Sequence, residues 1–148
     1  MKRLTGRRAL ITGASRGFGL EIAQRFAEEG ADLFLTSRSD GDLQKVGQQL
    51  SEYGVRVEWK SAEITDPESV RQMVNAAIDR YGGVDILVNN AGMHKVSPFL
   101  AYTPEEFDRI MKVNLYGVFY VCQAVLPHMI RRGGGKVVNI ASTAGKGV

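Results

Sequence analysis

The stretch Thr12-Gly13-Ala14-Ser15-Arg16-Gly17-Phe18-Gly19 decides the fold of this chain, because its glycines separate a predicted strand from a predicted helix. Residues 8–12 are apolar and predict the strand, and the residues after the glycines have the spacing of an amphipathic helix. Gly13 permits a tight turn, while Gly17 and Gly19 let the backbone approach a pyrophosphate and let the helix pack close to the sheet. The free N–H groups at the start of the helix favour such an anion. The candidate contacts in this turn are Thr12, Gly13, Ser15, Arg16, Gly17, Phe18 and Gly19.

The rest of the chain continues the alternation of strands and helices. Further strands are predicted over residues 32–37, 55–61, 85–89 and 136–141, and further helices over 40–53, 67–81 and 104–132, the last bent near Pro127. This alternation indicates an α/β fold with a mostly parallel sheet covered on both faces. Right-handed crossovers favour a doubly wound Rossmann-type sheet of strand order 3-2-1-4-5. With no repeat or linker in the sequence, residues 1–148 are expected to form a single nucleotide-binding domain.

Composition excludes several classes of protein and site. The net charge of +3 comes from scattered basic residues, so nucleic-acid binding is not indicated. Cys122 is the single cysteine, which rules out an intrachain disulfide, and two isolated histidines do not predict a metal site. No signal-peptide stretch follows the charged N-terminus, and no apolar run approaches membrane-spanning length. The expectation is a cytoplasmic protein that binds no nucleic acid, membrane or metal.

A rival interpretation exists for the glycine turn. Residues 13–17 also read G-x-S-x-G, the nucleophile elbow of hydrolases, with Ser15 as the nucleophile. A hydrolase elbow normally lies well inside a larger sheet, whereas this one follows the first strand, and Gly19 has no role in it. A glycine-rich turn without any ligand is the other alternative. The strand–turn–helix context favours the dinucleotide site over both.

Four motifs together resemble the classical short-chain dehydrogenase/reductase family. TGASRGFG at residues 12–19 is similar to the cofactor turn of that family, and Asn89-Asn90-Ala91-Gly92 to its N-N-A-G element after the fourth strand. Asn114 matches the asparagine of the family's long helix, and Ser142 its catalytic serine at the end of the fifth strand. The resemblance covers essentially the whole chain. It implies hydride transfer between a nicotinamide cofactor and a carbonyl or alcohol substrate, with Asn90, Ala91 and Gly92 as cofactor contacts.

Two residues depart from the family pattern. Phe18 replaces the usual isoleucine between the last two glycines, and Glu63 stands where the family has an aspartate that contacts adenine. Glu63 and the following Ile64 are kept as candidate contacts for the adenine.

The residues after the second strand predict the choice of cofactor. An acid at this place accepts bonds from the adenine ribose in NAD-binding folds, but here Ser37 is followed by Arg38, and Asp40 and Asp42 come later. Arg38 would attract a ribose 2′-phosphate, and Arg16 in the glycine turn could reach the same group. Ser37, Arg38 and Arg16 therefore predict NADP(H).

The catalytic set is incomplete within the 148 residues. The resemblance implies that Ser142 donates to the developing oxyanion and that Asn114 holds a water in a proton relay. The family's Tyr-x-x-x-Lys pair is missing, since none of the five tyrosines has a lysine four residues later. We expect a truncated reductase that is inactive alone, from a parent that is a homodimer or homotetramer. In the family, 3-oxoacyl reduction is the commonest activity. A non-catalytic nucleotide-binding or regulatory protein is the alternative, and a bare fifth strand predicts poor solubility or self-association.

Overall fold

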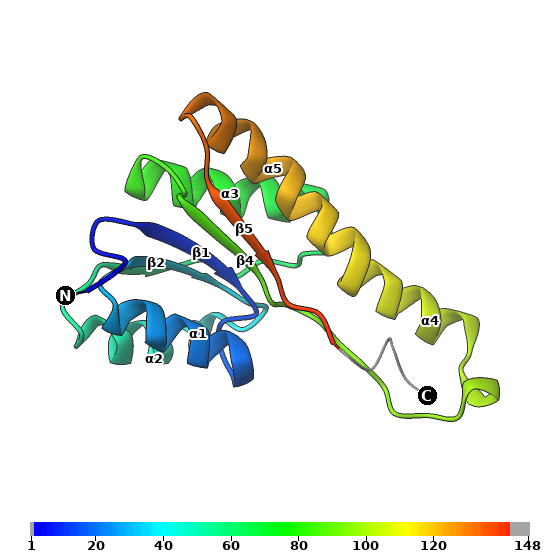
Figure 1. The fold of residues 1–148 in the computed structure, drawn as a ribbon. Helices are drawn as coiled ribbons and strands as arrows, with labels where there is room; N and C mark the ends of the chain where they lie inside the picture. The colour runs from blue at the N-terminus through cyan, green and yellow to red at the C-terminus, as the bar shows by residue number, and fades with distance from the viewer. Residues whose placement is uncertain (1, 143–148) are drawn as a thin grey trace.

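The computed structural model describes residues 2–142 and contains one parallel sheet of strand order β3-β2-β1-β4-β5 (Figure 1). Its strands are β1 (Arg8–Thr12), β2 (Asp32–Thr36), β3 (Val57–Trp59), β4 (Ile86–Asn89) and β5 (Lys136–Asn139). The helices are α1 (Gly17–Glu28), α2 (Asp40–Ser51), α3 (Pro67–Tyr81), α4 (Pro104–Met111) and α5 (Gly117–Arg131). A 3-10 turn covers Phe99–Ala101, and a π-helical turn, Lys112–Tyr116, joins α4 to α5. The predicted fold class and strand order are confirmed.

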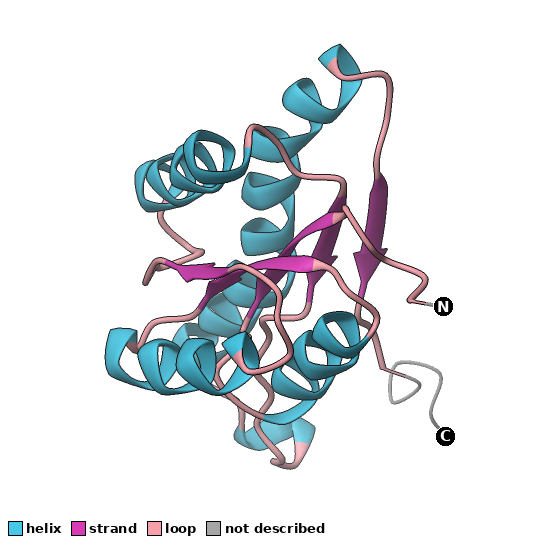
Figure 2. Ribbon diagram, turned by 90° about the vertical axis from the view of Figure 1, so that its left-hand side faces the viewer, coloured by secondary structure: helices cyan, strands magenta, loops and turns pink. Residues whose placement is uncertain are grey.

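Two hydrophobic cores lie on opposite faces of the sheet, as Figure 2 shows with helices on both sides of the strands. Successive side chains of a strand point to opposite faces. In β1, Leu10 therefore packs into the core under α3 and α5, whereas Ala9 and Ile11 pack into the core under α1 and α2. Because both faces are covered, the central strands are apolar throughout, and this is the pattern that made them predictable.

The structure changes some of the predicted boundaries. β3 has three residues where the alternation predicted seven, and β5 ends at Asn139. The predicted long helix is continuous through Pro127, which lies inside α5, but a π-helical turn interrupts its regular α-helical pattern earlier, at Lys112–Tyr116. That turn contains Asn114, whose side chain bonds to the backbone of Met93.

The helical run Pro104–Arg131 corrects one statement made from the sequence. Its 28 residues have a window of mean hydropathy 1.3, so it is long and apolar enough to cross a membrane by length and composition. Core helices of soluble proteins pass the same test, which makes this weak evidence for a membrane span. Only 22% of the window is buried, so this helix has an apolar surface that residues 2–142 leave largely uncovered.

The start of β1 is joined to the segment before β4 by a half-buried ion pair. Arg8 donates from Nε to Asp85 Oδ2 at 2.7 Å and from Nη2 to Asp85 Oδ1 at 2.8 Å, and its backbone N–H also bonds to Asp85. Burial alone raises the pKa of Asp85, but the hydrogen bonds and charge of Arg8 outweigh it and hold that pKa below its ordinary value. The folded state is therefore more stable when Asp85 is ionised.

Asp85→Asn should lower the free energy of unfolding by about 2–3 kcal/mol at neutral pH, because it leaves a half-buried guanidinium without its charge partner. A carboxyl whose folded pKa is depressed stabilises the fold above its unfolded value, near 4, and loses this effect as the pH falls through the folded value. The free energies of unfolding of the wild type and Asp85→Asn, measured with urea, should thus differ equally at pH 7 and 5. The difference should shrink as the pH falls below about 4. Glu68→Gln, which breaks the exposed pair with Arg71, is the control and should cost under about 0.5 kcal/mol. Equal losses in the two variants would contradict the prediction.

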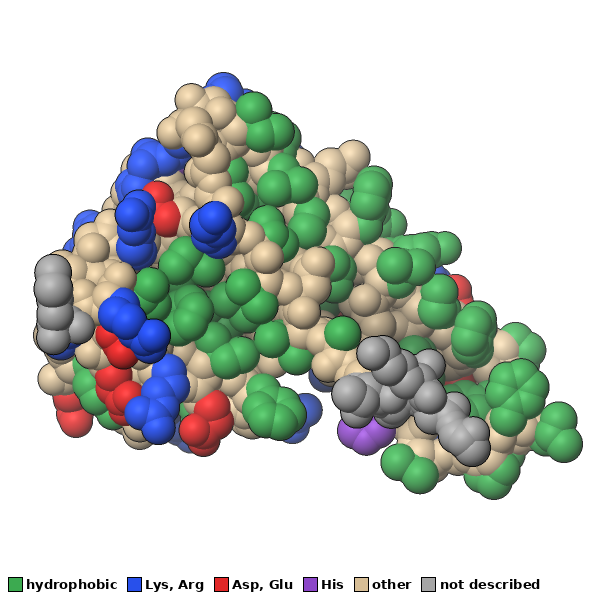
Figure 3. Space-filling model, viewed as in Figure 1, with side chains coloured by type: hydrophobic (Ala, Val, Ile, Leu, Met, Phe, Trp, Pro, Cys, Tyr) green, Lys and Arg blue, Asp and Glu red, His purple; other side chains and the backbone are tan. Residues whose placement is uncertain are grey.

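Apolar side chains lie exposed on β5 and along the neighbouring helix. Within residues 2–142, β5 pairs with β4 alone, and all four of its residues are exposed. Val137 and Val138 are 38% and 43% exposed, and Phe119 and Ile130 of α5 are 56% and 74% exposed. In Figure 3, hydrophobic side chains run along this side of the molecule. An unpaired strand edge beside apolar surface is a template for pairing with another chain.

We expect the isolated 148-residue chain to self-associate, with a concentration-dependent mass in size-exclusion chromatography with light scattering. Val138→Lys should increase the monomer fraction because it places a charge on the exposed edge strand. Val96→Lys is the matched control, since Val96 is 92% exposed but lies in a loop. A monodisperse wild-type monomer that melts cooperatively would contradict this expectation.

Candidate functional site

The glycine turn is held against the end of β4 by Thr12 and Asn90. The Oγ1 of Thr12 accepts hydrogen bonds from the backbone N–H groups of Asn90 and Ala91, both at 3.0 Å. In return, the Nδ2 of Asn90 donates to the carbonyl oxygens of Thr12 at 3.1 Å and of Gly13 at 3.2 Å. These four bonds join the two predicted motifs, and they give Thr12 and Asn90 a positioning role in the turn.

Gly13 and Gly19 allow the two segments to lie this close. Gly13 has φ +65°, and a Cβ added there would lie 2.9 Å from the Cα of Ala91. A methyl group at Gly19 would overlap the carbonyl oxygen of Gly13 and the Nδ2 of Asn90. Gly17 differs, because its φ is +56° but the space beside it is open. Gly17 is therefore required by its backbone conformation, Gly13 by its conformation and by close packing, and Gly19 by close packing alone.

The first turn of α1 is open to an anion. No side chain caps this helix within the described part of the chain, and its first turn has no acidic residue. By contrast, Ser39 caps α2, Asp66 caps α3 and Thr103 forms a capping box at the start of α4. A helix start has N–H groups without intrahelical partners and a partial positive charge. The start of α1 can therefore hold a phosphate next to the glycine turn.

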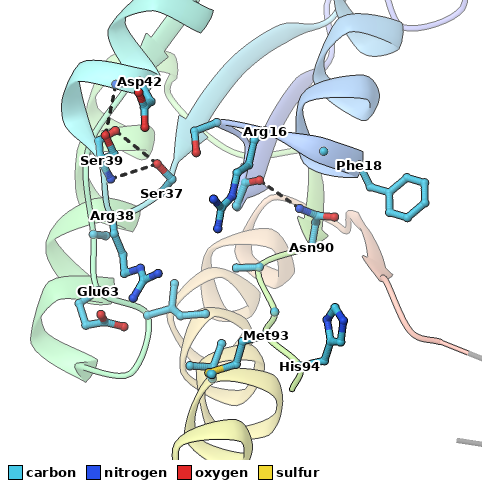
Figure 4. Close-up of a pocket in the computed structure, with 18 of the residues that line it drawn as sticks. Arg16, Phe18, Ser37, Arg38, Ser39, Asp42, Glu63, Asn90, Met93 and His94 are labelled. Carbon is cyan, nitrogen blue, oxygen red and sulfur yellow. Dashed lines mark hydrogen bonds between the residues drawn. The ribbon is translucent and has the colours of Figure 1, made fainter. Parts of the chain in front are cut away.

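A cavity of about 610 Å³ brings together most of the predicted site residues (Figure 4). It is formed where the glycine turn, the end of β2, the segment after β3 and the segment after β4 meet. This is the edge at which the carboxyl ends of parallel strands bind ligands in doubly wound folds. The predicted residues that line it are Gly13, Ser15, Arg16, Gly17, Phe18, Ser37, Arg38, Glu63, Ile64, Asn90, Ala91 and Gly92. Thr12, Gly19, Asn114 and Ser142 are not in its lining.

Arg16 and Arg38 are two of the three arginines that line the cavity. Among residues 2–142, neither Arg16 nor Arg38 makes a side-chain hydrogen bond or an ion pair, although many surface arginines pair with a carboxylate. Figure 4 shows the side chains of both reaching toward the middle of the cavity, with Phe18 turned away from it. No acid follows β2 directly, because Ser37 occupies that place and its hydroxyl bonds to Ser39. This end of the cavity has the donors that suit a phosphate group.

Glu63 lines the cavity, but its carboxylate is already engaged. Oε1 accepts from the backbone N–H of Thr65 at 3.1 Å and from its hydroxyl at 3.0 Å. Ile64 supplies an apolar wall and touches the long helix at Gly117, where an added Cβ would lie 2.7 Å from the Cδ1 of Ile64. The segment 62–64 is therefore held between its own turn and the helix, which shapes this wall of the cavity.

Asn114 connects the π-helical turn to the chain after β4. Its Oδ1 accepts from the backbone N–H of Met93 and its Nδ2 donates to the carbonyl oxygen of Met93, both at 2.8 Å. Met93 lines the cavity. The side-chain amide thus positions the segment that follows Asn90-Ala91-Gly92. Sequence analysis singled out Asn114, but this contact depends on a backbone irregularity that periodicity does not reveal.

Ser142 is exposed and lies three residues after the end of β5. On the same strand, Asn139 Oδ1 accepts a hydrogen bond from the Nδ2 of Asn89 at 2.9 Å, across the β4–β5 pair. The Nδ2 of Asn89 also contacts the sulfur of Cys122 at 3.3 Å. These part-buried polar contacts fix the end of β5, from which the chain continues to Ser142.

Sequence reasoning did not select every residue of the cavity. Met93 and His94, which directly follow Asn90-Ala91-Gly92, also line the cavity. Sequence reasoning missed Ser39, Asp42, Ala62, Arg109 and Val113. The helical spacing of Arg109 and Val113, four residues apart, places them on one face and was the available signal. Across residues 2–142, no group of three His, Cys, Asp or Glu side chains could hold a metal ion.

Comparison with known sequences gives relatives across nearly the whole chain. Residues 7–148 match the sequence model of the family described as short chain dehydrogenase. The oxidoreductase UcpA of Salmonella typhimurium is 42% identical over 145 residues, which cover 98% of this chain and 55% of that protein. The 3-oxoacyl-(acyl-carrier-protein) reductase FabG of Vibrio cholerae is 38% identical over 142 residues, covering 96% and 57%. The chain spans about half the length of these curated relatives.

Solved structures match the fold equally well. NAD+-bound xylitol dehydrogenase has a TM-score of 0.95 at 34% identity, covering 99% of this chain and 56% of that one. Actinorhodin polyketide ketoreductase with NADPH has a TM-score of 0.91 at 39% identity, covering 96% and 56%. Similar folds therefore hold either nicotinamide cofactor, and the hydrolase interpretation of Ser15 gains no support from these matches.

Proposed function

Because the chain belongs to the short-chain dehydrogenase family, we propose that its whole protein is an NADP(H)-dependent oxidoreductase that transfers hydride between nicotinamide and a carbonyl or alcohol carbon. The observation that carries the choice of cofactor is the pair Arg16 and Arg38. Both line the cavity, and neither has a protein partner within residues 2–142. Solved relatives are bound to NADPH in one case and to NAD+ in another, so the preference rests on these side chains.

The residues present fit such a dinucleotide. The glycine turn and the open start of α1 suit the pyrophosphate, and Arg38 with Arg16 suits a ribose 2′-phosphate. Ile64 and Val113 line the cavity as apolar walls for the adenine. When bound, the cofactor supplies or accepts the hydride. Residues 1–148 form, in this proposal, a single NADP(H)-binding domain.

The chain's own residues account for part of the chemistry. We assign Ser142 as a hydroxyl donor to the oxygen on which charge develops. We assign Asn114 as the residue that positions Met93 and the cavity wall, through its two bonds to that backbone. A proton donor with a tuned pKa is also needed, and no tyrosine of the 148 residues has a lysine four positions later. We therefore propose that these residues alone bind cofactor without turnover.

The test is NADPH oxidation by the full-length gene product across a panel of carbonyl compounds, with NADH as the matched cofactor. A 3-oxoacyl thioester belongs in the panel because one relative is a 3-oxoacyl reductase. We expect NADPH to be the better cofactor, while the 148-residue chain shows no turnover. No oxidation with any carbonyl, or equal use of the two cofactors, would contradict the proposal. A cytoplasmic location and a homodimeric or homotetrameric parent belong to the same proposal and are tested by fractionation and light scattering.

A further inference from the structure

The phosphate-binding end of the cavity contains an acid as well as arginines. Asp42, in the first turn of α2, lines the same cavity as Arg38 and Ser39. In Figure 4 it lies beside Ser39, on the same side of the cavity as Arg38. Its backbone N–H bonds to the Oγ of Ser39 at 3.4 Å. The carboxylate of Asp42 has no ion pair or hydrogen bond with any residue in 2–142, so its charge is not compensated by a protein cation.

The other acid of the cavity differs in this respect. The carboxylate of Glu63 accepts two hydrogen bonds from Thr65, which turn it toward its own segment. Of the two cavity acids, Asp42 is thus the one whose carboxylate makes no hydrogen bond within residues 2–142. A phosphate monoester carries a charge of roughly −1.5 to −2 at pH 7. Two anions that share one end of a cavity repel one another even through solvent.

We propose that Asp42 is a specificity-determining residue that opposes the ribose 2′-phosphate and so limits the preference for NADP(H) over NAD(H). This inference rests on the proposed function, because it needs the 2′-phosphate to lie between Arg38 and the start of α2. The repulsion by Asp42 then partly cancels the attraction of the 2′-phosphate by Arg16 and Arg38. Its removal makes the site more selective for NADP(H), not less.

Asp40 separates this role from a role in the stability of α2. Both acids lie in the first turn of α2, where a negative charge stabilises the helix start. Asp40 does not line the cavity, whereas Asp42 does. Asp40→Asn and Asp42→Asn therefore remove equal charges from the same helix end, and only one of them changes the charge in the cavity.

The experiment measures dissociation constants of NADPH, NADH, 2′,5′-ADP and 5′-ADP for the wild-type full-length protein and both variants, at low and high salt. We expect D42N to bind NADPH and 2′,5′-ADP about three- to tenfold more tightly, as for one charge repulsion at several ångströms in a solvated site. NADH and 5′-ADP should bind D42N unchanged, and D40N should match the wild type within about twofold for every ligand. The gain in D42N should shrink at high salt because solvent ions screen the repulsion.

The results distinguish the inference from the proposed function. A wild-type protein that does not bind NADPH would overturn the proposed function and the inference with it. Wild-type binding of NADPH with D42N no tighter than D40N would overturn only the inference. Weaker NADH binding by D42N, with NADPH unchanged, would also overturn it, because Asp42 would then be an acceptor for the ribose hydroxyls.

Discussion

Arg38→Asp should weaken NADPH binding by about a hundredfold or more and tighten NADH binding. Loss of a charge-assisted hydrogen bond to a phosphate costs roughly 1.5–3 kcal/mol, and the new carboxylate adds repulsion. An acid at this end of β2 also accepts bonds from the ribose hydroxyls of NAD(H), which explains the gain for NADH. Arg38 is well placed for this test because no other residue in 2–142 engages its guanidinium. Fluorescence titration of the reduced cofactors measures both changes.

Arg7→Asp is the control for this substitution. Arg7 is exposed, precedes β1 and does not line the cavity, so the same charge change should alter both affinities by less than about twofold at moderate salt. The single substitution Arg16→Ala should also weaken NADPH binding, because the guanidinium of Arg16 enters the cavity from the glycine turn. If Arg38→Asp and Arg7→Asp change NADPH binding alike, the 2′-phosphate does not lie at Arg38.

Gly19→Ala should reduce cofactor affinity about a hundredfold and lower the free energy of unfolding by about 2–3 kcal/mol. The added methyl would overlap the carbonyl oxygen of Gly13 and the Nδ2 of Asn90, so the glycine turn and the end of β4 must separate. Moving them apart breaks the bonds by which Asn90 holds the carbonyls of Thr12 and Gly13. The start of α1 then no longer faces the phosphate in the required geometry.

Gly41→Ala is the matched control, since Gly41 lies in a helix, has no positive φ and has open space beside it. Its substitution should be neutral or slightly stabilising, by under about 1 kcal/mol, because alanine favours a helix. Cofactor titration and urea unfolding of both variants give the comparison. A Gly19→Ala protein that binds NADPH like the Gly41→Ala protein would show that the turn tolerates a side chain, and the proposed packing role would be wrong.

The parts of the fold that sequence analysis predicted correctly are those with a local cause. β1, β2 and β4 are buried on both faces, so each is a short apolar run between turn residues. Asp66 and Pro67 mark the start of α3 because the cap and the proline act within one turn. The glycine turn could be predicted from the sequence for the same reason. Its glycines are needed where a side chain would clash or the backbone has a positive φ.

The missed features depend on residues far apart in the chain. The π-helical turn at Lys112–Tyr116 accompanies the bonding of Asn114 to Met93, 21 residues earlier, and hydrophobic periodicity contains no sign of it. Asp42 and Arg109 belong to two different helices, α2 and α4, and only the folded chain brings both to the lining of one cavity. Sequence analysis placed each on a helix but could not say which cavity their side chains would line.

The α/β alternation and the phosphate-binding turn could be predicted from the sequence, because periodicity, caps and glycine conformations are properties of a few neighbouring residues. The strand order followed from the general handedness of crossovers in such an alternation. The sequence also placed Arg16 and Arg38 at positions from which they could reach a ribose phosphate. The tertiary structure was needed to show that neither arginine has a protein partner within residues 2–142, and that Asp42 lines the same cavity. The electrostatic potential at a site is the sum of charges from all the segments that surround it. It can therefore be judged only when the folded structure shows which segments lie side by side.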